Sequence, residues 1–334
     1  MTGWTEQVLA TEATFRRAPS AHNTQPATLF ADGETLVGGW DPARELLVAD
    51  PTRRDLWLSL GAFVESVRIA AADAGLGVGV VWDVDARAHR VARLVETDAR
   101  PLPGGFTAED LRARRTARGP YTEPFAGAVT VGDVGVDAAL GDQARLSVVA
   151  RALIDELLPV ADRWSYGSPA QVAELRRWLR LDAGDPRYRV DGLTDEALAL
   201  TPLQARLVKT ALSPRVWSAL RRLGGPSLLA SASRISGRGT VVALHVAAAD
   251  TQSPHLVCAH GGALLRIWLA AQRQGLHVHP LSQLVDCPAT AVTLHEAVSA
   301  PDDDRQILSV FRIGRPAGQP VESARTRGSR QVWA

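Results

Sequence analysis

Two apolar helices far apart in the chain share a pattern of glycines that constrains the fold. The segments "LGAFVESVRIAAADAGLG" (60–77) and "HGGALLRIWLAAQRQGLH" (260–277) align without gaps. A glycine within a helix costs about 1 kcal/mol relative to alanine, so its recurrence at one distance from each helix end requires a cause. We expect two copies of one structural unit, with their long helices packed closely. The alternative is that any two buried helices that end at a glycine look alike. The recurring residues are Gly61, Ala70, Ala71, Gly75 and Leu76, and Gly261, Ala270, Ala271, Gly275 and Leu276.

A second pair of landmarks indicates where the two copies differ. "RRAPS" (16–20) follows the first predicted helix, and "RRTARG" (114–119) follows the helix that opens the second half. The second copy has about 102 more residues between its landmarks than the first, because the offsets are 98 and 200. We therefore expect an N-terminal unit at 1–103 and a C-terminal unit at 104–334, with a helical insert at about 151–238 that we interpret as a lid.

Hydrophobic periodicity and turn residues predict a mixture of helices and strands in both halves. In the N-terminal half we expect helices over 5–17 and 55–74, then strands over 77–83 and 90–96. In the C-terminal half we expect helices near 108–115, 152–164, 170–181, 202–223 and 260–274, and strands near 145–150, 240–247 and 307–314.

Composition and charge limit the classes of partner. Hydrophobic residues make up 46% of the chain of 334 residues and the net charge is +1. This balance is typical of a globular protein and gives no general electrostatic case for nucleic acid or an anionic membrane. The N-terminus shows neither the apolar core nor the cleavage site of a signal peptide, and we expect a cytoplasmic protein. Cys258 and Cys287 are expected to be inert core thiols.

The stretch "APSAHNTQP" (18–26) places five polar side chains between two prolines. Such residues often form hydrogen bonds with their own backbone in turns and caps. The alternative is that Ser20, His22, Asn23 and Gln25 surround a ligand. The stretch alone does not decide between these interpretations.

The stretch "RRTARGPY" (114–121) has features of an anion site. Arg114, Thr116 and Arg118 recur at every second position where a helix meets a loop. The planar guanidinium group matches phosphate oxygens, and a hydroxyl group can add a donor. A solvated basic face is the alternative. The basic stretch "ARTRGSRQV" (324–332) is either a tail or the completion of such a site.

Other motifs do not provide a site by themselves. The closely spaced glycines of "GLGVGVVWD" precede a strand, so the context of a dinucleotide fingerprint is missing. "HGG" (260–262) occurs without the GxSxG sequence of esterases. His277 and His279 form only a pair where zinc needs three or four ligands, and we predict no metal site.

Taken together, "APSAHNTQP", "RRTARGPY", "GGALLRIWLAAQRQGLHVHPLSQ" and "FRIGRP…ARTRGSRQV" resemble the nitroreductase superfamily, most closely its Acg-like branch of single-chain flavoproteins. Ordinary members are homodimers that bind FMN at the subunit interface. The branch looks like such a dimer fused into one chain. The resemblance implies an α+β fold of two tandem repeats, each a mainly antiparallel sheet flanked by helices. It also implies a monomer acting as a fused pseudo-dimer, with further association left open.

The resemblance also implies the cofactor and its contacts. FMN carries the chemistry, so no catalytic side chain is assigned. The first half lacks the hydroxyl and the second arginine of the phosphate motif, so we expect one FMN for each chain. The implied cofactor-binding residues are Pro19, Ser20, His22, Asn23 and Gln25 at the isoalloxazine, Arg114, Thr116, Arg118, Arg325 and Arg327 at the phosphate, and Pro280, Leu281, Ser282 and Gln283 near flavin N5.

The implied activity is that of an FMN-dependent oxidoreductase. It would transfer hydride to or from a small organic substrate, such as a nitroaromatic, a quinone or a natural-product intermediate, with NAD(P)H as the donor in the reductive direction. The alternative is an FMN-sequestering protein whose lid excludes NAD(P)H. A further alternative is an apo structural protein. Ala27 departs from the family, which usually has an aromatic residue there, so it opens space or weakens cofactor packing.

Overall fold

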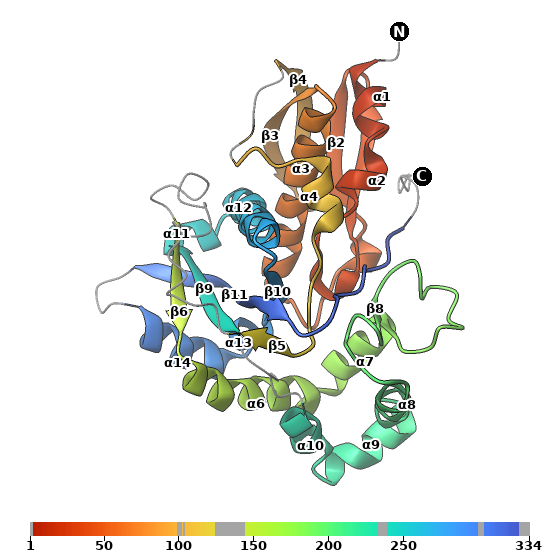
Figure 1. The fold of residues 1–334 in the computed structure, drawn as a ribbon, viewed down its shortest axis with the longest axis vertical. Helices are drawn as coiled ribbons and strands as arrows, with labels where there is room; N and C mark the ends of the chain where they lie inside the picture. Colours follow the sequence, from red (N-terminus) through yellow and green to blue (C-terminus); the bar gives the residue numbers. More distant parts are fainter. Residues whose placement is uncertain are drawn as a thin grey trace.

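The structure, a computed structural model, describes residues 3–98, 102, 104–123, 144–232, 239–299 and 304–326. Two mainly antiparallel sheets lie at opposite ends of a pair of long helices (Figure 1). One large core runs through both sheets and both helices. The α+β class predicted from the sequence is confirmed.

The N-terminal half contains the first sheet, with strand order β1-β2-β4-β3. Every neighbouring pair of strands in it is antiparallel. The helix and strand predictions from 54 to 97 are confirmed. The elements of this half are α1 (Trp4–Leu9), α2 (Glu12–Phe15), η1 (Ala21–Asn23), β1 (Ala27–Asp32), β2 (Thr35–Trp40), η2 (Pro42–Arg44), α3 (Arg54–Asp73), β3 (Gly77–Asp85) and β4 (Arg90–Thr97).

Two predictions in this half need correction. The single helix expected over 5–17 is wrong, because the chain breaks into α1 and α2 at Ala10 and Thr11. The Thr11 hydroxyl donates to the carbonyl of Val8, which is the local side-chain bond that competes with a continuous helix. The hairpin β1–β2 was missed. Its turn contains Asp32 and Gly33, and Gly33 has a φ of +58°, so the "DG" dipeptide was the available signal.

The C-terminal half contains the second sheet, with strand order β10-β11-β9-β6 and β5 paired to β11. The sequence analysis did not predict α13 and α14, which lie between β10 and β11. The elements outside the insert are α4 (Ala108–Ala113), β5 (Tyr121–Glu123), β6 (Ala144–Val149), β9 (Thr240–Ala247), α11 (Ala248–Thr251), α12 (Pro254–Arg273), β10 (His277–Pro280), α13 (Gln283–Asp286), α14 (Pro288–Val298) and β11 (Arg305–Pro316).

The long helices α3 and α12 pack directly against each other, as the glycine pattern predicts. A side chain at Gly61 or Gly261 would collide with the backbone of the opposite helix. Both helices also end in the same way. Gly75 and Gly275 follow them with φ of +77° and +70°, and the next amide in each case donates to the helix carbonyl five residues back at 2.9 Å. This shared ending is the glycine motif that closes many helices. It supports the repeat interpretation, which stays a prediction.

The described part of the insert has a small core of its own around Val172, Leu212 and Trp217. The helix predicted over 202–223 is two helices, because Pro214 starts a new one after Ser213. Trp217 is buried against Tyr166, so these rings fill the core of the insert. The insert elements are α6 (Arg151–Gly167), α7 (Pro169–Trp178), β7 (Leu179–Arg180), β8 (Leu193–Thr194), α8 (Pro202–Ala211), α9 (Pro214–Arg222) and α10 (Gly225–Ala232).

Candidate functional site

The loop of residues 18–26 has a strained backbone. His22, Asn23 and Gln25 have φ of 47°, 53° and 52°, in the left-handed region that side chains other than glycine rarely adopt. Each such residue costs of order 1–3 kcal/mol, and they persist where surrounding contacts impose them. One local contact is the amide of Gln25, which donates to Ser20 Oγ at 2.9 Å. The loop therefore contains turn chemistry, and more contacts hold it from outside.

The amide side chain of Asn23 ties the loop to two distant segments. Its Nδ2 donates to the carbonyls of Gly192 and Ala324, both at 3.1 Å. The amide of Gly192 donates in return to the carbonyl of Asn23 at 3.1 Å. This exchange pairs the loop with the insert through two hydrogen bonds.

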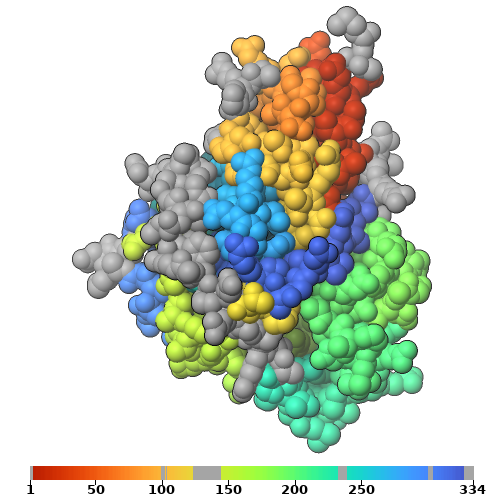
Figure 2. All heavy atoms as spheres, viewed as in Figure 1, coloured from red at the N-terminus to blue at the C-terminus, as the bar shows by residue number. Residues whose placement is uncertain are grey.

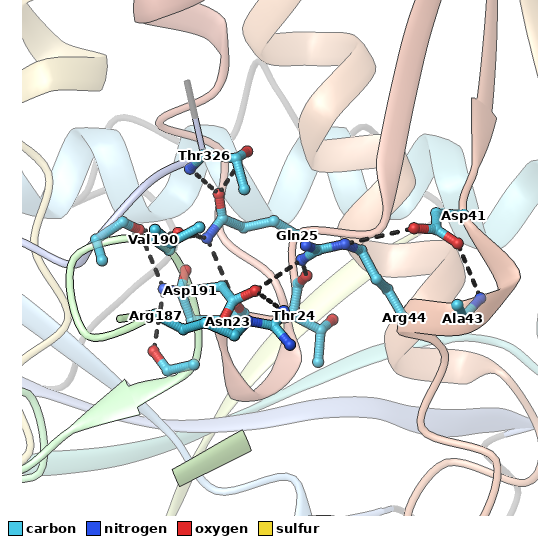
Figure 3. A network of polar contacts seen from close by, with 12 residues as sticks. Asn23, Thr24, Gln25, Asp41, Ala43, Arg44, Arg187, Val190, Asp191 and Thr326 are labelled. Carbon is cyan, nitrogen blue, oxygen red and sulfur yellow. Dashed lines mark hydrogen bonds and ion pairs between the residues drawn. The ribbon is translucent and has the colours of Figure 1, made fainter. Parts of the chain in front are cut away.

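Gln25 makes a parallel set of contacts (Figure 3). Its Nε2 donates to the carbonyl of Val190 at 2.9 Å, and its Oε1 accepts from the amide of Thr326 at 2.9 Å. Three segments with sequence positions near 23, 191 and 325 therefore meet at one place. The side-chain amides of Asn23 and Gln25 are both engaged with other parts of the protein.

A buried ion cluster lies beside this junction. Asp191 is fully buried and accepts from Arg44 at 3.2 Å, from Arg180 at 2.8 Å and from Arg187. We call these four residues the Asp191 cluster. Arg44 also donates to the carbonyl of Thr24 and pairs with Asp41, so it belongs to the N-terminal half. The cluster therefore fastens the insert to the loop, as Figure 3 shows.

Arginines of two further segments converge on the end of α2. Arg325 donates to the carbonyl of Arg16 at 2.7 Å, to that of Arg17 at 3.1 Å and to Asn23 Oδ1 at 2.8 Å. Arg114 donates to the same carbonyl of Arg17 at 3.3 Å. The predicted phosphate residues Arg114 and Arg325 therefore lie together beside the loop, although about 210 residues separate them. We call Arg17, Arg114, Arg115 and Arg325 the basic cluster.

The charges in the basic cluster oppose one another. Burial and the charge of Arg17 lower the pKa of Arg114 to about 9, and the same causes lower the pKa of Arg325. Among the described residues, the carboxylate that pairs with this cluster is Glu322, which contacts Arg17 at 2.9 Å and Arg115 at 3.0 Å. Its side chain is 59% exposed, so water screens it. The Nε atoms of Arg17 and Arg114 are buried with no hydrogen-bond partner. The cluster is thus electrostatically suited to an anion.

Arg118 has other partners than Arg114 and Thr116, and the predicted three-residue phosphate clamp stays a prediction. Arg114 donates to Thr116 Oγ1 at 3.3 Å, whereas Arg118 donates to the carbonyl of Ala197 in the insert at 3.2 Å. Burial lowers the pKa of Arg118 to about 10. The preceding residue, Ala117, donates its amide to the carbonyl of Val278 in β10 at 3.1 Å.

Two neutral imidazoles flank Arg118. Burial and then the charge of Arg118 lower the pKa of His22 to about 4. The same causes, with Arg312 added, hold the pKa of His279 well below its ordinary value. The Nδ1 atom of each ring is buried with no hydrogen-bond partner. Both rings are therefore neutral near pH 7 and can accept or donate one hydrogen bond each.

The predicted segment Pro280–Gln283 connects to the loop indirectly. The amide of Leu281 donates to Val310, and Gln283 Nε2 donates to Asp162 Oδ1 at 3.3 Å. Ser282 stands at the start of α13. At the end of that helix, Asp286 pairs with Arg54 at 2.9 Å.

Arg54, the first residue of α3, links Asp286 to the loop of residues 18–26. It pairs with Asp55 at 2.8 Å, and the charge of Asp55 acts on His22 in the loop. Burial raises the pKa of Asp286 to about 7, and burial together with Asp55 raises the pKa of Asp50 to about 6. The raised pKa values of Asp50 and Asp286 mean that both carboxyl groups bind a proton more tightly than an ordinary aspartate does.

A cleft opens beside the loop at Ala27. It measures about 290 Å³ out to the adjoining solvent, and Pro19, Ser20 and Phe63 are among the residues that line it. A neighbouring cleft of about 260 Å³ shares Ala27 and Gln25 with the first. Ala27, where the resemblance expects an aromatic ring, thus lines both clefts.

Some predicted features lie outside the site or outside the described residues. Arg327 is not among the described residues. Cys258 and Cys287 are free and buried, which confirms the prediction of core thiols. Within the described ranges, no three His, Cys, Asp or Glu side chains gather as metal ligands would. None of the described helices combines the length and apolar character needed to cross a bilayer.

The sequence analysis missed the residues that hold the site together. Arg17 directly precedes the loop of residues 18–26, Arg44 lies outside every predicted motif, and Asp191 lies in the insert at about 151–238 that was interpreted only as a lid. An Asp before Gly192 gives no sign of three arginine partners. Only Arg187 is a near neighbour, four residues away, whereas Arg44 belongs to the other half of the chain.

Comparison with known proteins places part of the chain beside a curated relative. It is 29% identical over 160 residues to the acg protein of Mycobacterium tuberculosis, in strains CDC 1551 and H37Rv, which carries the provisional name NAD(P)H nitroreductase. The aligned segment covers 44% of this chain and 47% of the relative, so the match spans about half of that protein's length. No family model matches the chain.

Solved structures give a weaker similarity. A Bacteroides fragilis nitroreductase with bound FMN is 12% identical with a TM-score of 0.36, over 68% of this chain and 97% of that one. The nitroreductase NfnB of Mycobacterium smegmatis, solved with NADPH, is 16% identical with a TM-score of 0.34, over 63% and 86% of the two chains.

Proposed function

This chain is related to the nitroreductase superfamily, and on that premise we propose that it is an FMN-dependent oxidoreductase of the nitroreductase type. One chain would form the complete site from its two halves, acting as a monomeric pseudo-dimer with tandem units at 1–103 and 104–334. The observation that carries the proposal is the basic cluster beside the loop of residues 18–26. The curated relative is named as an NAD(P)H nitroreductase, which supports the same type of reaction and donor.

The basic cluster fits a phosphate group. Arg114 and Arg325 are held close to Arg17 although their charges repel, and the Nε atoms of Arg17 and Arg114 have no protein partner. A phosphate ester has a charge of about −1.5 to −2 at pH 7, which would offset this repulsion. We therefore assign the FMN phosphate to Arg114, Thr116 and Arg325. Arg17 is an addition to the predicted set, and Arg327 stays in that set as a prediction.

The remaining residues would surround the ring system. Bound FMN supplies hydride transfer through its N5 atom. Arg118 carries positive charge next to two neutral imidazoles, which suits the negative charge that a reduced flavin develops. We keep Pro19, Ser20, His22 and the segment 280–283 as ring contacts. For Asn23 and Gln25 we propose a positioning role, because their amides already bind other parts of the chain.

The substrate would be a small organic molecule. A nitroaromatic, a quinone or a natural-product intermediate fits a flavin site with no nucleophile of its own. The protein's part is to bind and orient the molecule beside the ring and to exclude water. The insert would supply that cover. Its Gly192 contacts the loop of residues 18–26, and its Ala197 contacts Arg118.

The test begins with the visible spectrum of the purified protein after incubation with FMN. A flavin spectrum that survives gel filtration and bleaches with NADH or NADPH under argon supports the proposal. A colourless protein that takes up no FMN rejects it. Arg114→Ala should release FMN, while Arg93→Ala, which changes an exposed side chain of β4, should retain it.

A second candidate is an FMN-sequestering protein without NAD(P)H turnover. The observation in its favour is the Asp191 cluster, which fastens the insert over the loop with a fully buried carboxylate and three arginines. A flavin that dithionite reduces but both nicotinamide nucleotides leave oxidised favours this candidate. Asp191→Asn should then make the flavin reducible by NADPH, because the insert loosens.

A further inference from the structure

The helices α8, α9 and α10 expose large apolar side chains at one end of the molecule. Leu203 and Leu207 on α8 are 67% and 60% exposed, Leu223 after α9 is 82% exposed, and Leu228 on α10 is 69% exposed. In Figures 1 and 2 these helices form the end of the molecule farthest from β3 and β4. The core of the insert does not use these leucines, because Leu212 and Trp217 fill it from the opposite side.

The spacing on α8 shows that the exposed leucines form a face. Leu203 and Leu207 are four residues apart, so they lie one turn above each other. Ala205 is buried on the other side of α8, and Leu212, directly after the helix, is buried as well. The apolar side towards solvent is therefore a second stripe, in addition to the stripe that packs against the insert.

The same segment is strongly basic. Residues 202–232 contain Arg206, Lys209, Arg215, Arg221 and Arg222 and no Asp or Glu. The rest of the chain contains 32 basic and 36 acidic residues. The net charge of +1 is therefore the sum of +5 on residues 202–232 and −4 on the rest of the chain, which we call the body of the protein. An expectation based on net charge alone overlooks this separation.

We infer that α8, α9 and α10 are a docking surface for an anionic lipid bilayer. Basic side chains beside exposed leucines are the composition of helices that lie in the membrane interface. The basic side chains match the negative surface of anionic lipids, and the leucines enter the boundary of the acyl chains. Nucleic acid would match the charge but gives the leucines nothing to bury against.

The body of the protein would stay in water on this surface. Its net charge of −4 is repelled by anionic headgroups, so the protein should orient with the insert towards the bilayer. The insert also carries Asp191 and contacts the loop of residues 18–26, so lipid binding is placed at the element that covers the proposed cofactor site. The inference itself does not depend on the proposed function.

The test is vesicle flotation of the full-length chain. Vesicles of phosphatidylcholine and phosphatidylglycerol in equal parts should carry the protein up the gradient at low salt, and pure phosphatidylcholine vesicles should not. Raising the salt should weaken binding, because the Debye length falls from about 30 Å at 0.01 M to about 10 Å at 0.1 M. The double variant Leu203→Glu, Leu207→Glu should lower the partition coefficient at least about tenfold.

A charge variant and a matched control complete the design. Arg221→Glu with Arg222→Glu should abolish flotation with anionic vesicles. Val292→Glu removes an apolar side chain that is 59% exposed on α14, outside α8, α9 and α10, and should leave flotation unchanged. Unchanged thermal unfolding of each variant shows that the insert still folds.

Three results would overturn the inference. The first is no flotation with anionic vesicles at low salt. The second is an equal loss of binding in the Val292→Glu control. The third is tighter binding to a DNA duplex, or self-association, that the leucine variants alter while vesicles remain unbound. The last of these would assign the surface to nucleic acid or to a second copy of the chain.

Discussion

Gly61 and Gly261 each face the backbone of the other's helix. A Cβ atom on Gly61 would lie 1.8 Å from the carbonyl oxygen of Cys258, and one on Gly261 would lie 2.3 Å from that of Leu58. The helices α3 and α12 can approach this closely only because both positions lack a side chain. The two glycines that align in the sequence are thus the contact through which the two halves meet.

Gly61→Ala should therefore destabilise the protein by about 3 kcal/mol, because neither backbone can move without disturbing the core. Gly262→Ala is the control in the same contact region. Its Cβ would meet the Cβ of Glu65 at 3.4 Å, and helix propensity favours alanine by about 1 kcal/mol. Urea unfolding of both variants measures the difference. Equal stabilities would show that the helices separate easily.

Replacing Arg114 should have opposite effects on stability and on cofactor retention. The lowered pKa of Arg114 reports that its charge is unfavourable where it lies. Arg114→Met should raise the unfolding free energy of the FMN-free protein by about 1 kcal/mol, as replacement of a buried charge often does. The same variant should fail to retain FMN. A loss of stability comparable to that expected for Gly61→Ala would contradict this assignment of the charge.

Asp191→Asn should release the insert from the loop. It leaves three arginines around a neutral group, and breaking a buried ion pair costs about 3–5 kcal/mol. Trypsin should then cut at Arg187 and Arg189 at least about tenfold faster, which mass spectrometry of the fragments can follow. Asp182→Asn is the control in the same span, since its pair with Lys209 is exposed. Equal cleavage rates in the two variants would mean that the cluster does not hold the insert.

Asp286 should make the protein less stable as the pH rises. Burial raises its pKa from 3.8 to about 7 in the folded state, so the folded protein holds this proton more tightly than the unfolded chain. Its contribution is fully present below pH 4 and disappears as the pH rises through 7, by roughly 2–4 kcal/mol. Asp286→Asn should remove this slope from a series of urea unfolding experiments at pH 4 to 8. Asp155→Asn, at an exposed site on α6, should keep it.

His22 should act in the other direction. Its pKa falls from 6.5 to about 4 on folding, so the unfolded chain binds the proton more tightly. Stability is therefore full above pH 6.5 and decreases as the pH falls towards 4, by roughly 2–3 kcal/mol. His22→Gln should make the protein more resistant to acid, as measured by its thermal unfolding midpoint at pH 5. His255→Gln, at an exposed histidine, is the control and should be as acid-sensitive as the parent. The same acid sensitivity in His22→Gln would refute the prediction.

The parts of the fold that could be predicted depend on local signals. The helix from 54 to 73 is a long apolar segment that ends before Gly75, and the strand over 240–247 is a run of mostly apolar residues with three valines. The structure has both almost as expected. The hairpin at 27–40 was missed because its second strand has two glycines and buries both faces, which removes the alternation of polar and apolar residues. Tertiary contacts decided that segment.

The site divides in the same way. Arg114, Arg325 and the loop of residues 18–26 could be named from motifs, and the structure brings them together. The direction of Arg118 and the partners of Asn23 could not be named, because both depend on where residues 190–197 of the insert lie. Burial and pairing are properties of the folded chain, and no short motif encodes them.

The hydrogen bonds of Gln25 have a consequence for the order of synthesis. Gln25 binds Ala324 and Thr326, which are made about 299 residues later in the chain. At roughly 5–20 residues per second, the ribosome needs about 15 to 60 seconds to cover that distance. During that time the loop of residues 18–26 lacks the hydrogen bonds to Ala324 and Thr326 that hold it in the folded protein. Whatever binds there can be captured only after nearly the whole of this sequence has been translated.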